Sequence, residues 1–303
     1  MRSCLLCLIA GAMGWLACER AATPPPETVM PGWDAVQDST HRVASVTGFA
    51  GPEAVRYDPE QDVFFVSNFN GGGNERDANG FISRVSPEGD VLDLRFMVGT
   101  DAHPLHAPRG MFITGDTLWA ADADGLHGFD RHSGAHLAFV DFTGFAPGFL
   151  NDVTAGPDGA LYVTDTGARR VYRRAGARVE VVLEDTTLAP NGITWDAASG
   201  RMLLAPWGGD QLFRAWQPGT DSLGVAGTGT GGHYDGIEVV AGRVLVASQT
   251  DSSLHVLEDG TSRPVIRTPG RPADIGIDTQ RMRVAVPYVA LNRVDIWQLP
   301  REN

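Results

Sequence analysis

Six short stretches of the 303-residue chain resemble one another and share a column of residues that could bind a cation. They begin at residues 52, 108, 150, 190, 234 and 272 and read PEAV, PRGM, LNDV, PNGI, YDGI and PADI. The second positions are occupied by Glu53, Arg109, Asn151, Asn191, Asp235 and Ala273. Four of these residues carry carboxylate or amide oxygens, the ligands that hard divalent cations prefer.

A repeat fold places equivalent residues at equivalent positions, so repeats that close into a ring would direct this column toward one axis. We therefore predict one divalent cation bound by the four oxygen-bearing residues Glu53, Asn151, Asn191 and Asp235. Oxygen ligands favour Ca²⁺, with Zn²⁺, Mn²⁺ or Mg²⁺ as alternatives. Asn and Asp are also common turn residues, so the competing interpretation is that each one only caps the strand that follows it.

Arg109 occupies the same column, where its positive charge would repel a bound cation. In one interpretation the side chain turns away or pairs with Glu53 or Asp152. In a second, it holds a carboxylate or oxyanion of a substrate beside the cation. In a third, it bridges Glu53 and Asp235 and replaces the cation. We predict the second interpretation, in which Arg109 binds substrate.

Histidine is suited to proton transfer near neutral pH, and some of the eight histidines lie close to this column. His233 precedes Asp235 by two residues, and His106 lies in the loop that enters the second repeat. We predict Asp235 and His233 as catalytic residues and His106 as a second substrate-binding residue. The alternative for each histidine is a solvated loop position. His136 and His255 are predicted to lie at the surface, near outer strands.

Strands must position these residues, because each stretch is followed by further runs of β-forming character. A second run covers residues 62–68, 116–122, 159–165, 200–206, 242–248 and 280–286. A third run covers residues 81–85, 126–130, 170–173, 211–216, 253–257 and 293–298. Turn sequences such as PEG, PDG and EDG separate the runs. No segment shows a long period of 3.6 residues, so the chain is predicted to be all-β.

The spacing of the repeats indicates how the strands are grouped. Successive stretches begin 56, 42, 40, 44 and 38 residues apart. Periods of this length with about four strands each are typical of a β-propeller, and six copies predict six blades over residues 39–300. The last copy ends after three strands. The strand-like segment 41–47 is predicted to supply the fourth, so that an N-terminal strand closes the ring.

Composition excludes several other functions. The net charge of −13 argues against a nucleic-acid partner, because phosphate binding needs clustered positive charge. All 24 basic residues are Arg, so Schiff-base chemistry and a phosphate-binding loop with its Lys are excluded. The sequence contains neither a GxSxG nucleophile motif nor a HExxH zinc motif.

The N-terminus predicts export and attachment to a membrane. Residues 1–18 combine an early Arg with an apolar run that ends at Cys18, as in a secretory signal peptide. The segment GWLAC is similar to a bacterial lipobox, in which Cys18 would be lipidated. An ordinary signal peptide cleaved nearby is the alternative. Residues 19–38, with three consecutive prolines, are predicted to form a flexible tether to the membrane, on the periplasmic face.

The four oxygen-bearing stretches resemble the metal-ligand motifs of the SMP-30/gluconolactonase/luciferin-regenerating family, over residues 48–300. The resemblance implies one axial divalent ion and hydrolysis of a lactone or related ester, with Asp235 activating water. Gluconolactonases carry an Arg two residues before the ligand Asn, where this chain has Phe149. The related paraoxonases carry two His, one at the position of Arg109 and one near Asp122, and neither is His in this chain. Neither substrate-handling set is present. The alternative is therefore a non-catalytic propeller lipoprotein that binds a ligand or partner. In either case we expect a monomer.

Overall fold

The computed structural model describes residues 32–220 and 222–300, and within them almost all regular structure is strand. It contains 24 strands and three 3-10 helices of three residues each, at Ser39–His41, Thr143–Phe145 and Val289–Leu291. No α-helix is present in these ranges. The prediction of an all-β chain is confirmed. Cys18 and the predicted signal peptide lie outside the described residues.

The first two sheets contain four strands each, and neighbouring strands are antiparallel. One comprises β2 (Pro52–Asp58), β3 (Val63–Asn68), β4 (Phe81–Val85) and β5 (Val91–Val98). The next comprises β6 (Met111–Thr114), β7 (Thr117–Ala121), β8 (Gly125–Asp130) and β9 (His136–Asp141). A third sheet of the same design comprises β10 (Leu150–Ala155), β11 (Leu161–Asp165), β12 (Arg170–Ala175) and β13 (Arg178–Glu184).

An eight-stranded sheet follows, in which two four-stranded meanders are joined by a single parallel pairing of Thr228 with Thr261. Its first half comprises β14 (Pro190–Asp196), β15 (Arg201–Pro206), β16 (Leu212–Trp216) and β17 (Leu223–Thr228). Its second half comprises β18 (Tyr234–Val240), β19 (Arg243–Ser248), β20 (Ser253–Glu258) and β21 (Thr261–Arg267).

The last sheet joins the two ends of the described chain. It comprises β22 (Gly276–Asp278), β23 (Arg283–Tyr288), β24 (Arg293–Gln298) and β1 (Arg42–Thr47). Strand β1 pairs with β24 in antiparallel fashion, with Val46 opposite Val294. The segment that the sequence predicts as a closing strand therefore occupies that place.

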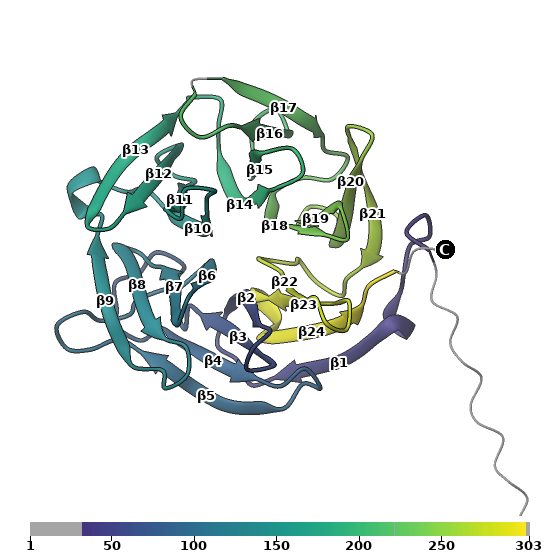
Figure 1. Ribbon diagram of the computed structural model, residues 1–303. Helices are drawn as coiled ribbons and strands as arrows, with labels where there is room; N and C mark the ends of the chain where they lie inside the picture. The colour runs from purple at the N-terminus through teal and green to yellow at the C-terminus, as the bar shows by residue number, and fades with distance from the viewer. Residues whose placement is uncertain (1–31, 221, 301–303) are drawn as a thin grey trace, which may run out of the picture. The chain divides into compact units, whose positions relative to one another are not determined.

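Figure 1 shows the sheets arranged around a common centre, with the first strand of each meander innermost and the last outermost. This arrangement is consistent with the predicted propeller. The burial of the strands follows from it. All six residues of β3 are buried, as expected for an apolar strand covered on both faces. In the outer strand β5, six of the eight residues are exposed, including the first five.

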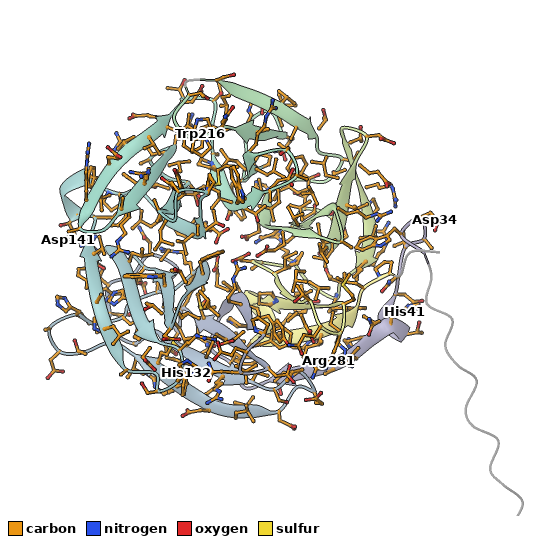
Figure 2. The ribbon with its side chains drawn as sticks, in the orientation of Figure 1. Asp34, His41, His132, Asp141, Trp216 and Arg281 are labelled. Carbon is orange, nitrogen blue, oxygen red and sulfur yellow. The ribbon has the colours of Figure 1, made fainter. Side chains whose placement is uncertain are left out.

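The apolar cores lie between neighbouring sheets. One cluster packs Val46 of β1 and Val55 and Phe64 of β2 and β3 against Val294 and Ile296 of β24. Figure 2 shows Trp216 within the ring, where it is fully buried, and charged residues such as Arg281 and Asp141 toward its outside.

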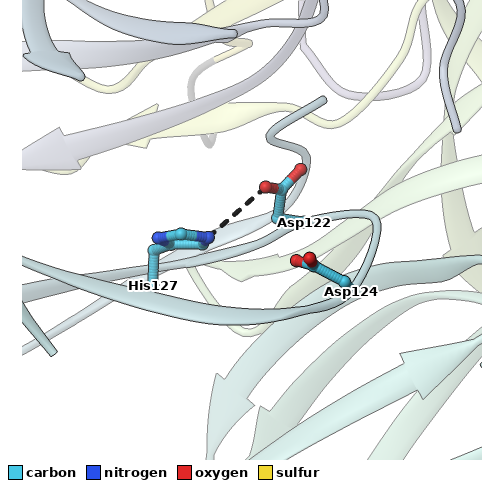
Figure 3. A group of neighbouring side chains, drawn as sticks. All are labelled: Asp122, Asp124 and His127. Atoms are coloured by element: carbon cyan, nitrogen blue, oxygen red, sulfur yellow. Dashed lines mark ion pairs between the residues drawn. The ribbon is translucent and has the colours of Figure 1, made fainter. Parts of the chain in front are cut away.

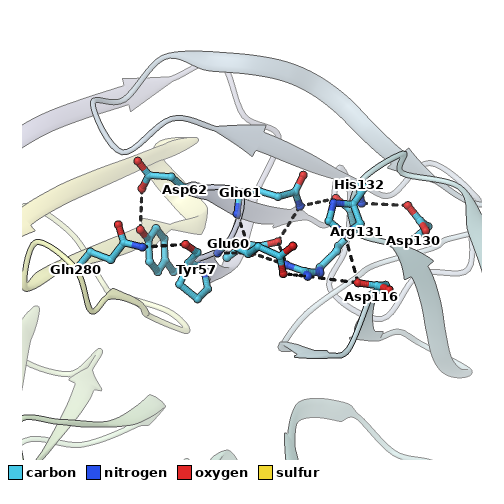
Figure 4. Close-up of polar contacts among 11 residues, drawn as sticks. Tyr57, Glu60, Gln61, Asp62, Asp116, Asp130, Arg131, His132 and Gln280 are labelled. Carbon is cyan, nitrogen blue, oxygen red and sulfur yellow. Dashed lines mark hydrogen bonds and ion pairs between the residues drawn. The ribbon is translucent and has the colours of Figure 1, made fainter.

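Polar clamps join neighbouring sheets at the ends of the inner strands opposite the column predicted to bind a cation. Arg131, after β8, donates to Asp58 at the end of β2 (2.7 Å) and to Glu60. Figure 4 shows Arg131 among Glu60, Asp116 and Gln61, with Tyr57 bonded to Asp62. Buried, hydrogen-bonded ion pairs of this kind fix one sheet relative to the next.

The described chain begins earlier than the predicted domain boundary at residue 39. Trp33 is 5% exposed and belongs to an apolar cluster with Val265 and Ile266 of β21. The backbone N–H of Gln37 donates to the Val265 carbonyl at 2.8 Å, and Arg267 N–H donates back to Gln37. Residues 32–38 are therefore part of the folded unit and not of a flexible tether, because Trp33 gains an apolar site on β21.

Helices long and apolar enough to span a membrane are absent from the part of the chain that the structure describes.

Candidate functional site

The predicted cation ligands line one cavity, where four of the inner strands begin. Glu53, Asn151, Asn191 and Asp235 are the second residues of β2, β10, β14 and β18. The cavity has a volume of about 430 Å³. Its other lining residues are Phe69, Phe149, Thr166, Gly167, Trp207, Gln249, Ala273 and Val289.

The same backbone irregularity occurs in all four of these strands. In β2 the register against β3 shifts between Pro52 and Val55, so that Glu53 and the residue after it interrupt the ladder. Equivalent shifts flank the ligand positions in β10, β14 and β18. A bulge re-aims the side chain that it carries. The two remaining positions of the column, Arg109 and Ala273, lie before their strands begin at Met111 and Gly276.

Glycines let the inner strands approach one another just behind the ligands. A Cβ atom at Gly110 would overlap the Asp152 carboxylate, and one at Gly236 would overlap Asp274. A Cβ atom at Gly192 would overlap the Asp235 carbonyl oxygen. These positions follow the column in the sequence, so each glycine lets the next inner strand approach closely, and the strands that follow Gly110 and Gly192 carry the predicted ligands Asn151 and Asp235.

Each of the four ligand residues presents an oxygen that has no hydrogen-bond partner. These atoms are Glu53 Oε2, Asn151 Oδ1, Asn191 Oδ1 and Asp235 Oδ1. All four residues are only 3–4% exposed. Leaving a buried polar atom unpaired costs about 1–3 kcal/mol, and more for a charged group. Four such oxygens around one cavity fit a divalent cation, whose coordination would satisfy them together.

The electrostatics of the carboxyl groups agree with this fit. Burial raises the pKa of Asp235 to about 7, although Gln249 Nε2 donates to its Oδ2 at 2.7 Å. Burial also raises the pKa of Glu53 well above its ordinary value, and the nearby Asp235 carboxyl adds to the effect. Without a cation, burial therefore favours the protonated form of both carboxyls up to a higher pH than in an exposed carboxyl.

Arg109 does not replace the cation. Its guanidinium donates to the Leu150 carbonyl at 2.6 Å and to Asn74 Oδ1 at 3.1 Å, and neither Glu53 nor Asp235 accepts a hydrogen bond from it. The residue is fully buried and does not line the cavity. The Phe149 ring lies over the guanidinium, on the side toward which a substrate role would require access, so substrate binding by Arg109 stays a prediction without direct support from this arrangement.

The two predicted histidines also lie outside the cavity wall. His106 Nδ1 accepts the Ala78 backbone N–H at 3.0 Å, and its Nε2 faces Asp124 at 3.6 Å. His233 packs against Trp207, with ring centroids 5.1 Å apart, and its Nδ1 lies 3.2 Å from Thr250 Oγ1. Neither imidazole is among the groups that line the cavity, so their predicted roles in substrate binding and catalysis lack direct access.

Several residues of interest were not predicted. Gln249 orients Asp235 from the end of β19, and the aromatic walls come from the β3–β4 and β9–β10 connections and from the residue after β15. Spacing alone does not identify them, because they lie outside the repeated column. His255, predicted to lie at the surface, is 1% exposed and bonded to Asp251 and Ser262, since it packs inside its own sheet.

Comparison with solved structures supports the fold. A gluconolactonase from Xanthomonas campestris matches with a TM-score of 0.63 and 18% identity, over 93% of this chain and 99% of that one. The calcium-binding protein regucalcin from Agrobacterium tumefaciens matches with a TM-score of 0.61 and 18% identity, over 84% and 96%. A virginiamycin B lyase from Staphylococcus aureus matches with a TM-score of 0.59 and 11% identity, over 84% and 98%.

No family model matches the sequence, and no curated protein matches it either. At identities below 20%, the structural matches establish the fold and leave the function to the site itself. The solved neighbours include a gluconolactonase, a calcium-binding protein and a lyase, so the fold is compatible with more than one chemistry.

Proposed function

We propose that the protein is a divalent-cation-dependent hydrolase that opens a lactone or a related ester. The observation that carries this proposal is the set of four unpartnered, buried oxygens on Glu53, Asn151, Asn191 and Asp235. The matches to a gluconolactonase and to a calcium-binding protein are in keeping with it. Calcium is the proposed ion because all four donors are oxygen atoms.

A cation held by these four residues would polarise the substrate carbonyl and stabilise negative charge on its oxygen. The chain itself supplies the proton acceptor. Asp235, buried at the cavity, is the carboxylate that would take a proton from water. Gln249 donates a hydrogen bond to Oδ2 of Asp235, and Oδ1 of the same carboxyl group has no hydrogen-bond partner. We do not assign His233 a part in proton transfer, since it packs against Trp207 and does not line the cavity.

The walls of the cavity favour an apolar, uncharged substrate. Phe69, Phe149, Trp207 and Val289 supply apolar side chains around the polar floor. None of the described residues that line the cavity is cationic, so apart from the proposed cation a substrate phosphate or carboxylate would have no positively charged partner there. We therefore propose a lactone or ester with an aliphatic or aromatic substituent, in place of a sugar lactone with many hydroxyl groups.

Ring opening of a panel of lactones tests the proposal. Aliphatic-substituted lactones should be hydrolysed in the presence of Ca²⁺, activity should disappear with a chelator, and it should return when the cation is restored. Asp235→Asn should abolish turnover, while Asp101→Asn, which alters an exposed carboxylate, should leave it unchanged. Hydrolysis that persists in Asp235→Asn at the wild-type rate would contradict the assigned site.

A non-catalytic role is the second candidate, and one observation favours it. Arg109, His106 and His233, the residues expected to handle substrate, all lie outside the cavity wall. In that case the cation and an apolar ligand would bind, but no member of the lactone and ester panel would be turned over. The assay therefore separates the two functions.

We further propose the organisation of the whole chain. The six four-stranded meanders represent six blades, closed by β1. Residues 1–18 are proposed as a signal peptide with Cys18 as the lipidated residue, and the protein as a monomer anchored on the periplasmic side of a membrane. A Cys18→Ser variant that still fractionates with membranes at unchanged mass would overturn the lipid anchor.

A further inference from the structure

A second group of metal-ligating side chains lies in the β6–β9 sheet, separate from the cavity. It comprises Asp122 and Asp124, which follow β7, and His127 of β8. One ligand atom from each lies within 4.8 Å of the other two. We propose that this group binds a divalent transition-metal ion of the Zn²⁺ type. The proposal is independent of the proposed hydrolase activity.

The strongest observation is a buried imidazole nitrogen that makes no hydrogen bond. His127 is fully buried, and its Nε2 has no hydrogen-bond partner. It is aimed into the group, 3.4 Å from Asp122 Oδ2, a separation suited to an ion pair but without the geometry of a hydrogen bond (Figure 3). Asp124 Oδ1 is also buried and unpartnered. His127 Nε2 and Asp124 Oδ1 are thus two buried acceptor atoms without partners, and a cation bound between them would satisfy both.

Neighbouring histidines hold the proposed ligands in place. His127 Nδ1 lies 3.1 Å from His136 Nε2, so a proton on His127 Nδ1 can be donated to His136 and the Nε2 lone pair is left for a metal. Metal-bound histidines usually donate their second N–H to such a partner.

His106 positions the third ligand in a similar way. Its Nδ1 accepts the Ala78 backbone N–H, so in the neutral ring the proton is on Nε2. That N–H faces Asp124 Oδ2 at 3.6 Å. Asp122 is fixed by the backbone N–H groups of His106 and Ala107, at 2.8 and 2.6 Å. Each proposed ligand therefore has an outer partner.

The donor set selects the class of ion. One imidazole and two carboxylates suit Zn²⁺, which binds His nitrogen and Asp oxygen and commonly keeps an open position. Ca²⁺ prefers oxygen donors alone and more of them. The Asp124 side chain is 18% exposed, which provides a route for the ion from solvent.

The site would brace one wall of the cavity. Loop 69–80 contacts the metal-binding turn through Arg76, which donates to the Ala123 carbonyl at 3.4 Å, and through Ala78 and His106. The same loop holds Asn74, which accepts from Arg109 beneath Phe149. An ion at Asp122, Asp124 and His127 would thus stiffen the loop that supports the aromatic wall.

Zn²⁺ titration of the purified full chain, after treatment with a chelator, tests the proposal. Wild type should bind one more zinc per chain than Asp124→Asn or His127→Gln, or bind it at least about tenfold more tightly. Asp101→Asn makes the same change of charge at an exposed residue between β5 and β6, and this variant should bind as much zinc as wild type. Cys4, Cys7 and Cys18 are present in every variant, so any zinc that they bind is a constant background.

The position of the bound ion decides between this site and the axial one. Asp235→Asn should retain the zinc that Asp124→Asn loses. Equal zinc binding by wild type, Asp124→Asn and His127→Gln would overturn the proposal and leave an ordinary His–Asp ion pair. Loss of all zinc in Asp235→Asn alone would also overturn it. Because His127 is fully buried, Asp124→Asn at the partly exposed turn is the variant expected to keep the fold.

Discussion

Arg109 lies against Phe149, with the guanidinium carbon 3.9 Å from the centre of the ring. The ring of Phe69 is also near the guanidinium, with its centre 5.7 Å from the guanidinium carbon. Two aromatic residues of the cavity wall therefore cover the buried guanidinium of Arg109. Burial lowers the pKa of Arg109 to about 10, and the side chain remains charged at neutral pH. A cation stacked on an aromatic face is worth about 2 kcal/mol when both are desolvated. Arg109 therefore supports the wall of the cavity from behind.

Replacing Phe149 should impair the binding of apolar substrates. Phe149→Ala removes a wall of the cavity and uncovers Arg109, so we expect KM for an aliphatic lactone to rise about tenfold, the effect of about 1.4 kcal/mol of lost apolar contact. Phe149→Leu should retain most of the affinity. Steady-state kinetics on one lactone measure both.

Phe96→Ala is the matched control for this variant. Phe96 also packs under an arginine, Arg84, at 5.2 Å, but it belongs to the outer strand β5 and does not line the cavity. Its loss should leave KM unchanged. If Phe149→Ala and Phe96→Ala have the same KM as wild type, Phe149 does not contact the substrate.

The fold was predictable because the same weak strand and turn patterns occur in each of the six sequence repeats, and together they give a clear indication. Each predicted second strand overlaps an observed one, from β3 at Val63–Asn68 to β23 at Arg283–Tyr288. The closing role of Arg42–Thr47 followed from a final repeat that lacks a strand. The packing of residues 32–38 against the sheet could not be predicted in this way. A Pro-rich composition does not indicate that Trp33 packs against apolar residues of β21, more than 200 residues away in the sequence.

The site was predictable only in part, for a related reason. Glu53, Asn151, Asn191 and Asp235 converge because their repeats place them alike. Arg109 belongs to the same column but is drawn away by Asn74, which lies in a loop outside the repeat pattern. The bulges at the ligand positions were also hidden, since they depend on strand pairing. Interactions specific to one repeat cannot be inferred from what all repeats share.

Loss of a charged ligand should weaken cation binding more than loss of a neutral one. Asp235→Asn leaves Glu53 as the one negative ligand of the set, so Ca²⁺ affinity should fall about a hundredfold or more, whereas Asn191→Ala should lower it about tenfold. Calorimetric titration with Ca²⁺ at fixed ionic strength measures both. Equal losses in the two variants would mean that Asp235 does not bind the ion as a carboxylate.

Gln249 should act on the cation through Asp235. Its Nε2 donates to Asp235 Oδ2, and this bond opposes the rise in the Asp235 pKa caused by burial. Gln249→Leu should raise that pKa further and weaken Ca²⁺ binding about tenfold near neutral pH, with recovery as the pH rises. A pH-independent loss would indicate a steric effect in place of the lost hydrogen bond.

The cation-free protein should lose stability as the pH rises. The folded state raises the pKa of Asp235 to about 7 and that of Glu53 well above its usual range. Between an unfolded pKa of about 4 and the folded values, the folded chain holds more protons than the unfolded chain, so the free energy of unfolding falls with increasing pH. Tm in chelator should therefore decrease from about pH 5 to pH 8.

Added Ca²⁺ should remove much of this pH dependence, because coordination favours the ionised carboxyls. The difference in Tm between Ca²⁺ and chelator should widen as the pH rises. Asp152, whose pKa burial raises to about 7, contributes to the same slope, so Asp235→Asn should reduce the slope without abolishing it. A Tm in chelator that rises over this range would contradict the buried, protonated carboxyls.

Trp33 should contribute to the stability of the ring although it precedes the first strand. Its indole packs with Val265 and Ile266, Arg263 donates to its carbonyl at 2.7 Å, and Arg243 lies over its ring. Trp33→Ala should lower the free energy of unfolding by about 3 kcal/mol, as measured by urea denaturation. Val36→Ala, three residues later at a position that is 48% exposed, should change it by less than about 0.5 kcal/mol. Equal unfolding midpoints for the two variants would show that the segment before β1 lies on the sheet without stabilising it, and the folded unit would then begin at β1.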